Sequence, residues 1–369
     1  MMETNANPQS TTGRILSLDA LRGFDMFWII GGDMLFIRLF KLFNMPAFEQ
    51  QFHHSEWNGF CFYDLIFPLF LFLVGMSIAL SLNRRIEQGD NMKNIYSHVL
   101  QRAVLLILFG LLYNDLMKFD FAGMRYTGVL QRIGICYLIA SIIVIQVPKN
   151  IQYIIVIVGL FAYWLLFAAL AAPGFAPGNL TPEGNIASYI DRLLLPGSFC
   201  CFTFGDNEGI MSTLPAVITT LTGVFAGNYL RSAAAPQVKA YAMFSAGMAS
   251  LLLSLLWSFF FPINKLLWTS SYVLHSTGWS LILFSIFYFI IDVKGFHKWS
   301  FFFKVIGMNA ITIYLASRFI DFNGLTESFF IGLSNLSGIA GPVVWALGFV
   351  IIKWLILYLF YKKQIFLKV

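Results

Sequence analysis

Long apolar stretches separated by short polar breaks make up most of this chain. A membrane-spanning helix needs about 20 apolar residues, because the hydrocarbon core of a bilayer is about 30 Å thick. Ten stretches reach that length: residues 18–43, 60–82, 98–118, 128–147, 151–171, 210–230, 238–261, 270–291, 301–320 and 341–361. They are too long for the strands of a membrane barrel. The pattern therefore predicts an all-α, polytopic membrane protein with about ten transmembrane helices.

The composition fits this class of protein. Of the 369 residues, 58% are hydrophobic and 11% are charged, which is far from the composition of a soluble globular domain. The 40 Phe, 15 Tyr and 9 Trp residues suit lipid-facing surfaces and the aromatic belts at membrane interfaces.

The basic residues predict the orientation. Fifteen of the 24 Lys and Arg residues fall on one side of the predicted membrane, and cytoplasmic loops are the ones enriched in Lys and Arg. Both termini are then cytoplasmic. The net charge of +6 follows from this bias, so we expect no nucleic-acid partner. The predicted cytoplasmic segments are 83–97, 148–150, 231–237, 292–300 and 362–369.

We expect a single transmembrane domain, residues 14–369, after a flexible cytoplasmic N-terminus. Residues 1–13 are polar and lack the features of a cleavable signal peptide. The one long outer connection, residues 172–209, is expected to form a lid or binding wall, since long loops in compact domains are commonly functional. Its amphipathic stretch Ile186–Leu195 predicts a short surface helix.

The four cysteines are expected to be structural. Cys61, Cys136, Cys200 and Cys201 show no metal-ligand spacing. Cys200 and Cys201 are neighbours in the outer loop, where a disulfide between them would be strained. We expect no bound metal.

The first polar break carries candidate chemistry. His53 and His54 lie between the first and second apolar stretches, with Asp33 near the outer end of the first and Asp64 in the head of the second. A lone histidine is more often structural than catalytic, and spacing alone does not choose between these two. Ionisable groups inside a span are costly, however, and a carboxylate near an imidazole favours proton or acyl chemistry.

Further polar groups occur at other span ends. Asp19 and Arg22 are three residues apart and can pair on one helical face, either as an anchor or as a site for an anionic ligand. Arg125 can reach the outer surface. Arg132, about one turn further in, needs a carboxylate, a cavity or a ligand. Asn309 is a polar group of no specific meaning by itself.

Nine motifs in a fixed order give a more specific signal. They are Ser17-Leu18-Asp19-Ala20-Leu21-Arg22-Gly23, His54-Ser55-Glu56-Trp57-Asn58-Gly59 leading into Asp64-Leu65-Ile66-Phe67-Pro68-Leu69-Phe70, Gly128-Val129-Leu130-Gln131-Arg132, Tyr189-Ile190-Asp191-Arg192, Asp206-Asn207-Glu208-Gly209, Asn264-Lys265-Leu266-Leu267-Trp268, Asp292-Val293-Lys294-Gly295, Gly307-Met308-Asn309 and Lys362-Lys363-Gln364-Ile365-Phe366. In these motifs the chain resembles the heparan-α-glucosaminide N-acetyltransferase family and its bacterial relatives, from about residue 14 to the C-terminus.

The resemblance implies an acetyl-CoA-dependent transmembrane acyltransferase. Such an enzyme would move an acetyl group from cytoplasmic acetyl-CoA to an amino sugar on the far side of a bacterial plasma (inner) membrane. The resemblance also implies a homodimer. The family's catalytic histidine matches His54 by its spacing to Trp57, and His53 has no counterpart. Asp33 stands where the family has asparagine, and we expect it to orient His54 as the base.

The resemblance also suggests which residues bind the two substrates. The expected acceptor-binding residues are Trp57, Asp64, Arg125, Arg132, Glu208 and Trp268. The expected residues at the acetyl-CoA site are Asp19, Arg22 and Asn309.

Both substrates can meet only if the protein hollows out the membrane from both sides, because acetyl-CoA is multiply anionic. We therefore expect a through-cavity that brings the thioester near Asp33 and His54. Direct attack by the acceptor amine and transfer through an acetylated His54 both fit. The competing functions are O-acetylation of an envelope polysaccharide and transport of a sugar or glycolipid, and a transporter would release no CoA.

Overall fold

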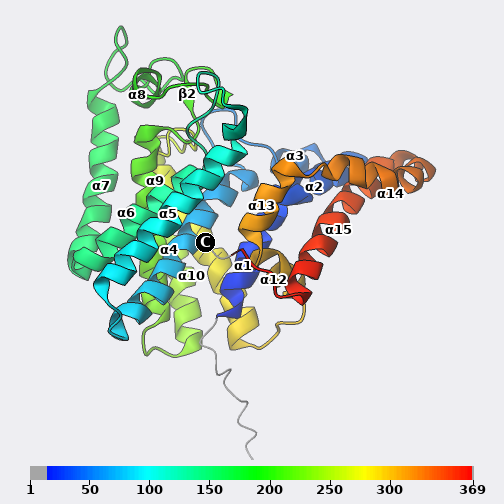
Figure 1. Ribbon diagram of the computed structural model, residues 1–369. Coiled ribbons are helices and arrows are strands. Elements are labelled where there is room, and N and C mark those ends of the chain that lie inside the picture. The colour runs from blue at the N-terminus through cyan, green and yellow to red at the C-terminus, as the bar shows by residue number, and fades with distance from the viewer. Residues whose placement is uncertain (1–14, 368–369) are drawn as a thin grey trace, which may run out of the picture.

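The computed structural model describes residues 15–367 as a helical membrane bundle (Figure 1). The predicted flexible N-terminus, residues 1–13, lies outside the described residues. Within the described part, eight helices are long and apolar enough to cross a membrane. These helices are α4 (Ile66–Glu87), α5 (Met92–Tyr113), α6 (Val129–Gln146), α7 (Lys149–Ala169), α9 (Ile210–Leu230), α10 (Pro236–Ser258), α11 (Ser270–Tyr288) and α15 (Gly341–Lys362). The predicted all-α, polytopic membrane class is confirmed.

Burial sorts these helices into a centre and a periphery. The spans containing α4 and α9 are each 72% buried, whereas the span formed by α10 is 22% buried and that of α7 is 28% buried. Helices α4 and α9 approach closely at Gly75. A Cβ atom at this position would lie 1.9 Å from the carbonyl oxygen of Thr220, so the contact requires a glycine. The peripheral helices turn most of their apolar surface outward, as expected where the solvent is lipid.

The first of the ten predicted spans is a broken helix. Helix α1 (Leu16–Phe27) is followed by a π-helical turn, Trp28–Gly32, and then by α2 (Asp33–Leu42). Gly31 has a φ of +128°, a conformation that residues with a Cβ atom rarely adopt. The Lys353 ammonium donates to the carbonyl oxygen of Ile30 at 3.0 Å, which satisfies a backbone group inside the turn.

The ninth predicted span is also broken. Helices α12 (Phe301–Gly307) and α13 (Ala310–Phe319) are separated at Met308 and Asn309. Helix α12 packs directly against α1 at Gly23. A Cβ atom at this position would lie 1.7 Å from the carbonyl oxygen of Phe303. Both broken helices still run from one end of the molecule toward the other (Figure 1). Their breaks place non-helical backbone inside the bundle, which a membrane protein tolerates where protein or a cavity surrounds it.

Short elements complete the fold. Helix α8 (Ile186–Leu194) confirms the predicted surface helix in the outer loop. The sequence did not predict α3 (Pro46–Gln50), the hairpin of β1 (Cys201–Phe202) with β2 (Gly205–Asp206), or α14 (Phe322–Leu336). Single turns occupy Phe62–Leu65, Leu116–Lys118, Phe289–Val293 and Gly338–Ala340. The end of the bundle that carries α8 and β2 is called the outer end below, following the predicted orientation.

Candidate active site

The histidine loop folds back onto the first turn of the second predicted span. The His54 Nδ1 atom lies 2.8 Å from Oδ1 of Asp64. The Asp64 side chain is fully buried, whereas that of His54 is 50% exposed. If Nδ1 carries the proton donated to Asp64, the unprotonated Nε2 is left to act as a base.

Backbone groups fix the Asp64 carboxylate in place. Its Oδ2 atom accepts hydrogen bonds from the backbone N–H groups of Ser55, at 3.2 Å, and Cys61, at 3.0 Å. The Tyr272 hydroxyl donates to the Asp64 backbone carbonyl at 2.7 Å. A buried carboxylate with these donors is held rigidly, and it therefore fixes the position of the imidazole that it contacts.

The contact of Asp64 with His54 corrects the expectation that Asp33 would be its neighbour. The Asp33 carboxylate instead hydrogen-bonds the Tyr63 hydroxyl and lies near the Lys353 ammonium. The Tyr63 ring in turn lies 4.9 Å from the His54 ring, measured between centroids. Asp33 sits in α2, after the helix break, and reaches the histidine only through this ring. His53 lies 3.6 Å from Glu49, and its side chain is 47% exposed.

A lysine from a distant loop joins this pair. The Lys265 Nζ atom lies 3.0 Å from Nδ1 and 3.4 Å from Nε2 of His54, and 3.4 Å from Oδ1 of Asp64. Burial lowers the pKa of Lys265 from its usual value, although the nearby Asp64 carboxylate favours the charged form. Carboxylate, imidazole and ammonium thus form one cluster.

A cavity of about 240 Å³ opens beside this cluster. Its polar lining comes from His54, Tyr63, Asn207, Glu208 and Lys265, and its remaining walls are mostly aliphatic and aromatic. A mostly apolar pocket with a few convergent polar groups is typical of a small-molecule site. We call it the outer cavity.

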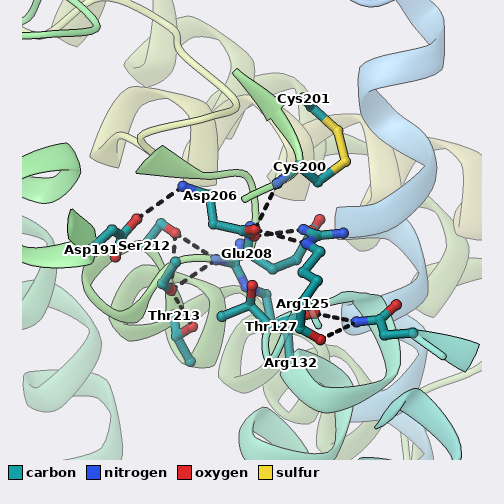
Figure 2. A network of polar contacts seen from close by, with 12 residues as sticks. Arg125, Thr127, Arg132, Asp191, Cys200, Cys201, Asp206, Glu208, Ser212 and Thr213 are labelled. Atoms are coloured by element: carbon teal, nitrogen blue, oxygen red, sulfur yellow. Dashed lines mark hydrogen bonds and ion pairs between the residues drawn. A yellow bond between two sulfur atoms is a disulfide. The ribbon is translucent and has the colours of Figure 1, made fainter. Parts of the chain in front are cut away.

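The charged network beside the outer cavity is shown in Figure 2. Arg125 donates to both carboxylate oxygens of Asp206, from Nε at 2.7 Å and from Nη2 at 2.5 Å, and it also pairs with Glu208. Burial alone would raise the pKa of Asp206, but the hydrogen bonds and charge of Arg125 lower it. The two carboxylates together raise the pKa of Arg125 despite its burial. Arg125 therefore fixes the position of Glu208 at the cavity wall.

The hairpin above this network contains a disulfide, shown at the top of Figure 2, between Cys200 and Cys201. The two cysteines are thus linked although they are neighbours in the chain. Cys201 adopts a left-handed conformation with a φ of +78°. The Cys200 backbone N–H donates to Asp206 at 3.0 Å, so the bonded pair covers the Arg125 network from the outside.

Three further predicted acceptor-binding residues make structural contacts. Arg132 is 1% exposed; it donates to the Gly209 carbonyl at 3.1 Å, and its guanidinium lies 5.0 Å from the centre of the Trp268 ring. The Trp57 indole donates to the Leu180 carbonyl in the long outer loop at 2.9 Å. Contact of these three residues with an acceptor stays a prediction.

A second cavity, of about 330 Å³, lies toward the inner end and is called the inner cavity. Its lining includes Arg22, Arg102, Asn309 and Thr312. Arg22 contacts Asp19 at 3.4 Å and also donates to Ser77. The predicted Asp19–Arg22 pair is confirmed, and the structure brings Arg22 and Asn309 to one cavity.

Several polar atoms of the inner cavity have no hydrogen-bond partner among the described residues. They are Nε of Arg102, both side-chain polar atoms of Asn309, and Oγ1 of Thr312. Buried polar groups are rarely left unpaired in proteins. A polar ligand in this cavity could supply the missing hydrogen bonds.

The two cavities are adjacent. Phe70, Ile133 and Ile311 line both of them. These side chains come from α4, α6 and the broken helix that contains α13. The outer and inner cavities therefore meet at an apolar boundary beneath His54, about one helical turn from the starts of α4 and α6.

Comparisons with known proteins identify the family of this chain. The family model described as heparan-alpha-glucosaminide N-acetyltransferase, catalytic, matches residues 14–256. The chain belongs to this family. It is 27% identical to heparan-alpha-glucosaminide N-acetyltransferase of Homo sapiens, over 98% of the chain and 62% of the relative. It is also 27% identical to the protein of the same name in Mus musculus, over 86% of the chain and 56% of the relative.

The chain thus spans about three fifths of the length of these relatives, and the matched part of the family model contains both His54 and Arg22. Lys265, Tyr63 and Arg102, which line the two cavities, were not predicted as site residues. A signal existed for Lys265, since it lies in one of the nine motifs. Tyr63 and Arg102 gave none, because an aromatic residue and an arginine at span ends are ordinary features of membrane helices.

Proposed function

We propose that this chain is an acetyltransferase that moves an acetyl group from acetyl-CoA, entering at the inner end, to an amino sugar at the outer end. The observation that carries the proposal is the pair of adjacent cavities, one lined by His54 and the other by Arg22 and Arg102. Membership of the family supports the type of reaction.

The inner cavity fits the donor chemically. Acetyl-CoA carries phosphate groups, an adenine and two amide bonds, so it needs cations together with neutral hydrogen-bonding groups. Arg22 and Arg102 supply the cations, and the unpaired amide of Asn309 and hydroxyl of Thr312 supply the neutral groups. The apolar boundary near Ile133 suits the thin pantetheine arm and excludes water from the thioester.

The outer cavity fits an amino-sugar acceptor. Its Glu208 carboxylate can attract an ammonium group, and His54 can remove a proton from it. We propose that the freed amine attacks the thioester directly, because adjacent cavities allow both substrates to meet at one point. Trp57, Asp64, Arg125, Arg132 and Trp268 would then contribute to acceptor binding directly or by fixing the cavity wall.

The cellular setting is part of the proposal. The basic loops at the inner end support an orientation with that end in the cytoplasm. We propose a bacterial plasma membrane as the location and a homodimer as the assembly, both from the family resemblance.

The deciding test is thiol release by the purified full-length protein. With acetyl-CoA and glucosamine we expect one CoA thiol for each acetylated amine. A neutral sugar that is acetylated in place of glucosamine would favour O-acetylation instead. Absence of CoA release with any acceptor, from folded protein, would support a transporter.

The matched histidines give the second test. His54→Ala should lower turnover by about 10²–10⁴-fold, the usual cost of losing a general base, and should leave CoA binding intact by calorimetry. His53→Ala should keep most activity, because His53 contacts Glu49 at the surface. Normal turnover by His54→Ala would end the assignment of His54 as the base.

A further inference from the structure

Lys265 is held next to His54 by a rigid loop. The loop between α10 and α11 is tied to the histidine loop where the Gly59 N–H donates to the Ile263 carbonyl at 2.8 Å. The side chains of Asn264 and Asn58 are also bonded, at 3.0 Å. Asn264 is completely buried. The Lys265 backbone therefore has little freedom to move away from the site.

The Lys265 side chain is only partly used by its protein partners. Its ammonium approaches the same Asp64 oxygen, Oδ1, that His54 contacts, at 3.4 Å compared with 2.8 Å for the imidazole. The side chain is 14% exposed, and it lines the outer cavity together with Glu208. An ammonium has three N–H groups, and this one has two partner side chains, Asp64 and His54, so one N–H is left for the cavity.

The Lys265 ammonium would not help His54 if the site needed only a base. A positive charge beside an imidazole opposes its protonation, whereas Asp64 by itself already orients His54. The Lys265 charge instead favours any negative charge that develops in the same cavity. In acyl transfer, that charge develops on the carbonyl oxygen of the acyl group.

We propose that Lys265 is the electrophilic residue of this site, which binds the thioester carbonyl oxygen and stabilises its negative charge during transfer. The proposal rests on the function proposed above and adds a second catalytic residue to it. It assigns separate roles to three clustered groups: Asp64 orients, His54 takes the proton, and Lys265 stabilises the oxyanion.

The reaction balances with these groups alone. His54 takes one proton from the acceptor ammonium, and the nitrogen lone pair forms a bond to the thioester carbon. The carbonyl π pair moves to oxygen beside Lys265 and returns when the carbon–sulfur bond breaks, with that bond's electron pair leaving on sulfur. A second nitrogen proton passes to the sulfur, and His54 releases its proton to the outside. The products are the acetamide, the CoA thiol and one proton.

The main test is Lys265→Gln in the full-length protein, with acetyl-CoA and glucosamine. Loss of one oxyanion donor typically costs 10²–10³-fold in turnover. We expect kcat to fall by about 10²–10³-fold, measured on the high-pH plateau of the rate profile, with both KM values within a few-fold. Lys118→Gln is the matched control, because Lys118 is an exposed outer-end lysine paired with Asp115. It should leave kcat unchanged.

A charge-rescue variant separates chemistry from folding. Lys265→Cys alkylated with 2-bromoethylamine regains an ammonium at nearly the original position and should recover most of the lost kcat. Alkylation of the same variant with iodoacetamide adds a neutral group and should recover none. The free cysteines Cys61 and Cys136 are buried, and wild-type protein treated with each reagent measures any effect at those positions.

A readout independent of activity follows from the charges around His54. Asp64 and Lys265 contact the imidazole, Tyr63 packs against it, and Glu208 shares the cavity. Lys265→Gln removes the only positive charge in that set, so His54 should be protonated at higher pH. The pH dependence of His54 acylation by diethylpyrocarbonate, followed by mass spectrometry, should shift to higher pH, as should the acid limb of kcat/KM.

The outcomes distinguish this inference from the proposed function. If wild type releases CoA and His54→Ala does not, but Lys265→Gln keeps kcat within fivefold, the role of Lys265 is overturned alone. A folded, aminoethylated Lys265→Cys protein that remains inactive also overturns it. If wild type releases no CoA, the proposed function fails first.

Discussion

The outer and inner cavities differ in how their polar groups are satisfied. In the outer cavity, His54, Asp64 and Lys265 contact one another, and Arg125 pairs with Asp206 and Glu208. In the inner cavity, Arg102, Asn309 and Thr312 keep polar atoms without a partner among the described residues. Asn207 Oδ1 is the one atom of this kind among the described residues that line the outer cavity. Most polar side chains of the outer cavity are therefore arranged by the protein itself, whereas several of those in the inner cavity lack partners.

This difference matches two kinds of task. Catalytic groups need fixed geometry before the substrate arrives, because electrostatic stabilisation works best when the protein does not reorganise during the reaction. Groups that bind a large polar ligand can obtain their hydrogen bonds from that ligand. We therefore expect substitutions in the outer cavity to act on turnover, and substitutions in the inner cavity to act on donor affinity.

The largest expected effect comes from Asp64→Asn. The amide cannot hold His54 in the same charged hydrogen bond, and it leaves Lys265 without its buried carboxylate. In serine proteases the corresponding aspartate-to-asparagine change lowers turnover by about 10⁴-fold. We expect a loss of about 10³–10⁴-fold in kcat here, measured by thiol release, together with a lower melting temperature.

Glu49→Gln is the matched control for Asp64→Asn. Glu49 also pairs with a histidine of the same loop, His53, at 3.6 Å, but at the protein surface. Its loss should change kcat by less than twofold. If folded Asp64→Asn kept activity within tenfold of wild type, the outer cavity would not be the preorganised catalytic site described above.

The sequence predicted the helical spans well because their signal is local. Apolar length alone identifies the eight continuous helices, and the same signal predicted two further spans that contain breaks. The breaks themselves are not visible in hydropathy. Gly31 and Asn309 interrupt their helices within apolar runs, and the contacts that stabilise those turns, such as Lys353 with Ile30, join residues 323 positions apart.

Some residues of the site were predicted and others were not, because contacts between residues far apart in the chain leave no local signal. The family resemblance selected His54 over His53, and it selected Arg22 and Asn309, which do line one cavity. The carboxylate partner was misjudged, because Asp64 was interpreted as the head of a span while the loop in fact folds back over ten residues to reach it. Lys265 lies 211 residues from His54 in the chain, so no spacing rule could pair them.

An intermediate effect is expected in the inner cavity. Asn309→Ala and Arg102→Gln each remove hydrogen bonds to the donor, and one such bond to a charged group contributes roughly 1.5–3 kcal/mol. We expect each variant to weaken CoA binding by about tenfold or more in calorimetry. With saturating acetyl-CoA, turnover should stay within a few-fold of wild type.

Lys149→Gln is the control for the inner cavity, because Lys149 is an exposed cation at the predicted cytoplasmic start of α7. It should leave the affinity for CoA unchanged. Added salt should weaken CoA binding to the wild type, since partly exposed charge pairs are screened. Unchanged affinity in both Asn309→Ala and Arg102→Gln would move the donor site elsewhere.

The smallest expected effect is that of Asp33→Asn. This variant tests whether Asp33, which contacts Tyr63, belongs to the group of residues that act on His54. Asp33 contacts Tyr63 rather than His54, so kcat on the plateau should stay within about threefold of wild type. A nearby carboxylate favours a protonated imidazole, and its removal should therefore shift the acid limb of the rate profile slightly to lower pH. This shift is opposite in sign to that of Lys265→Gln, so the two profiles, measured with the same substrates, check the charge geometry around His54. A shift of the Asp33→Asn profile to higher pH would contradict it.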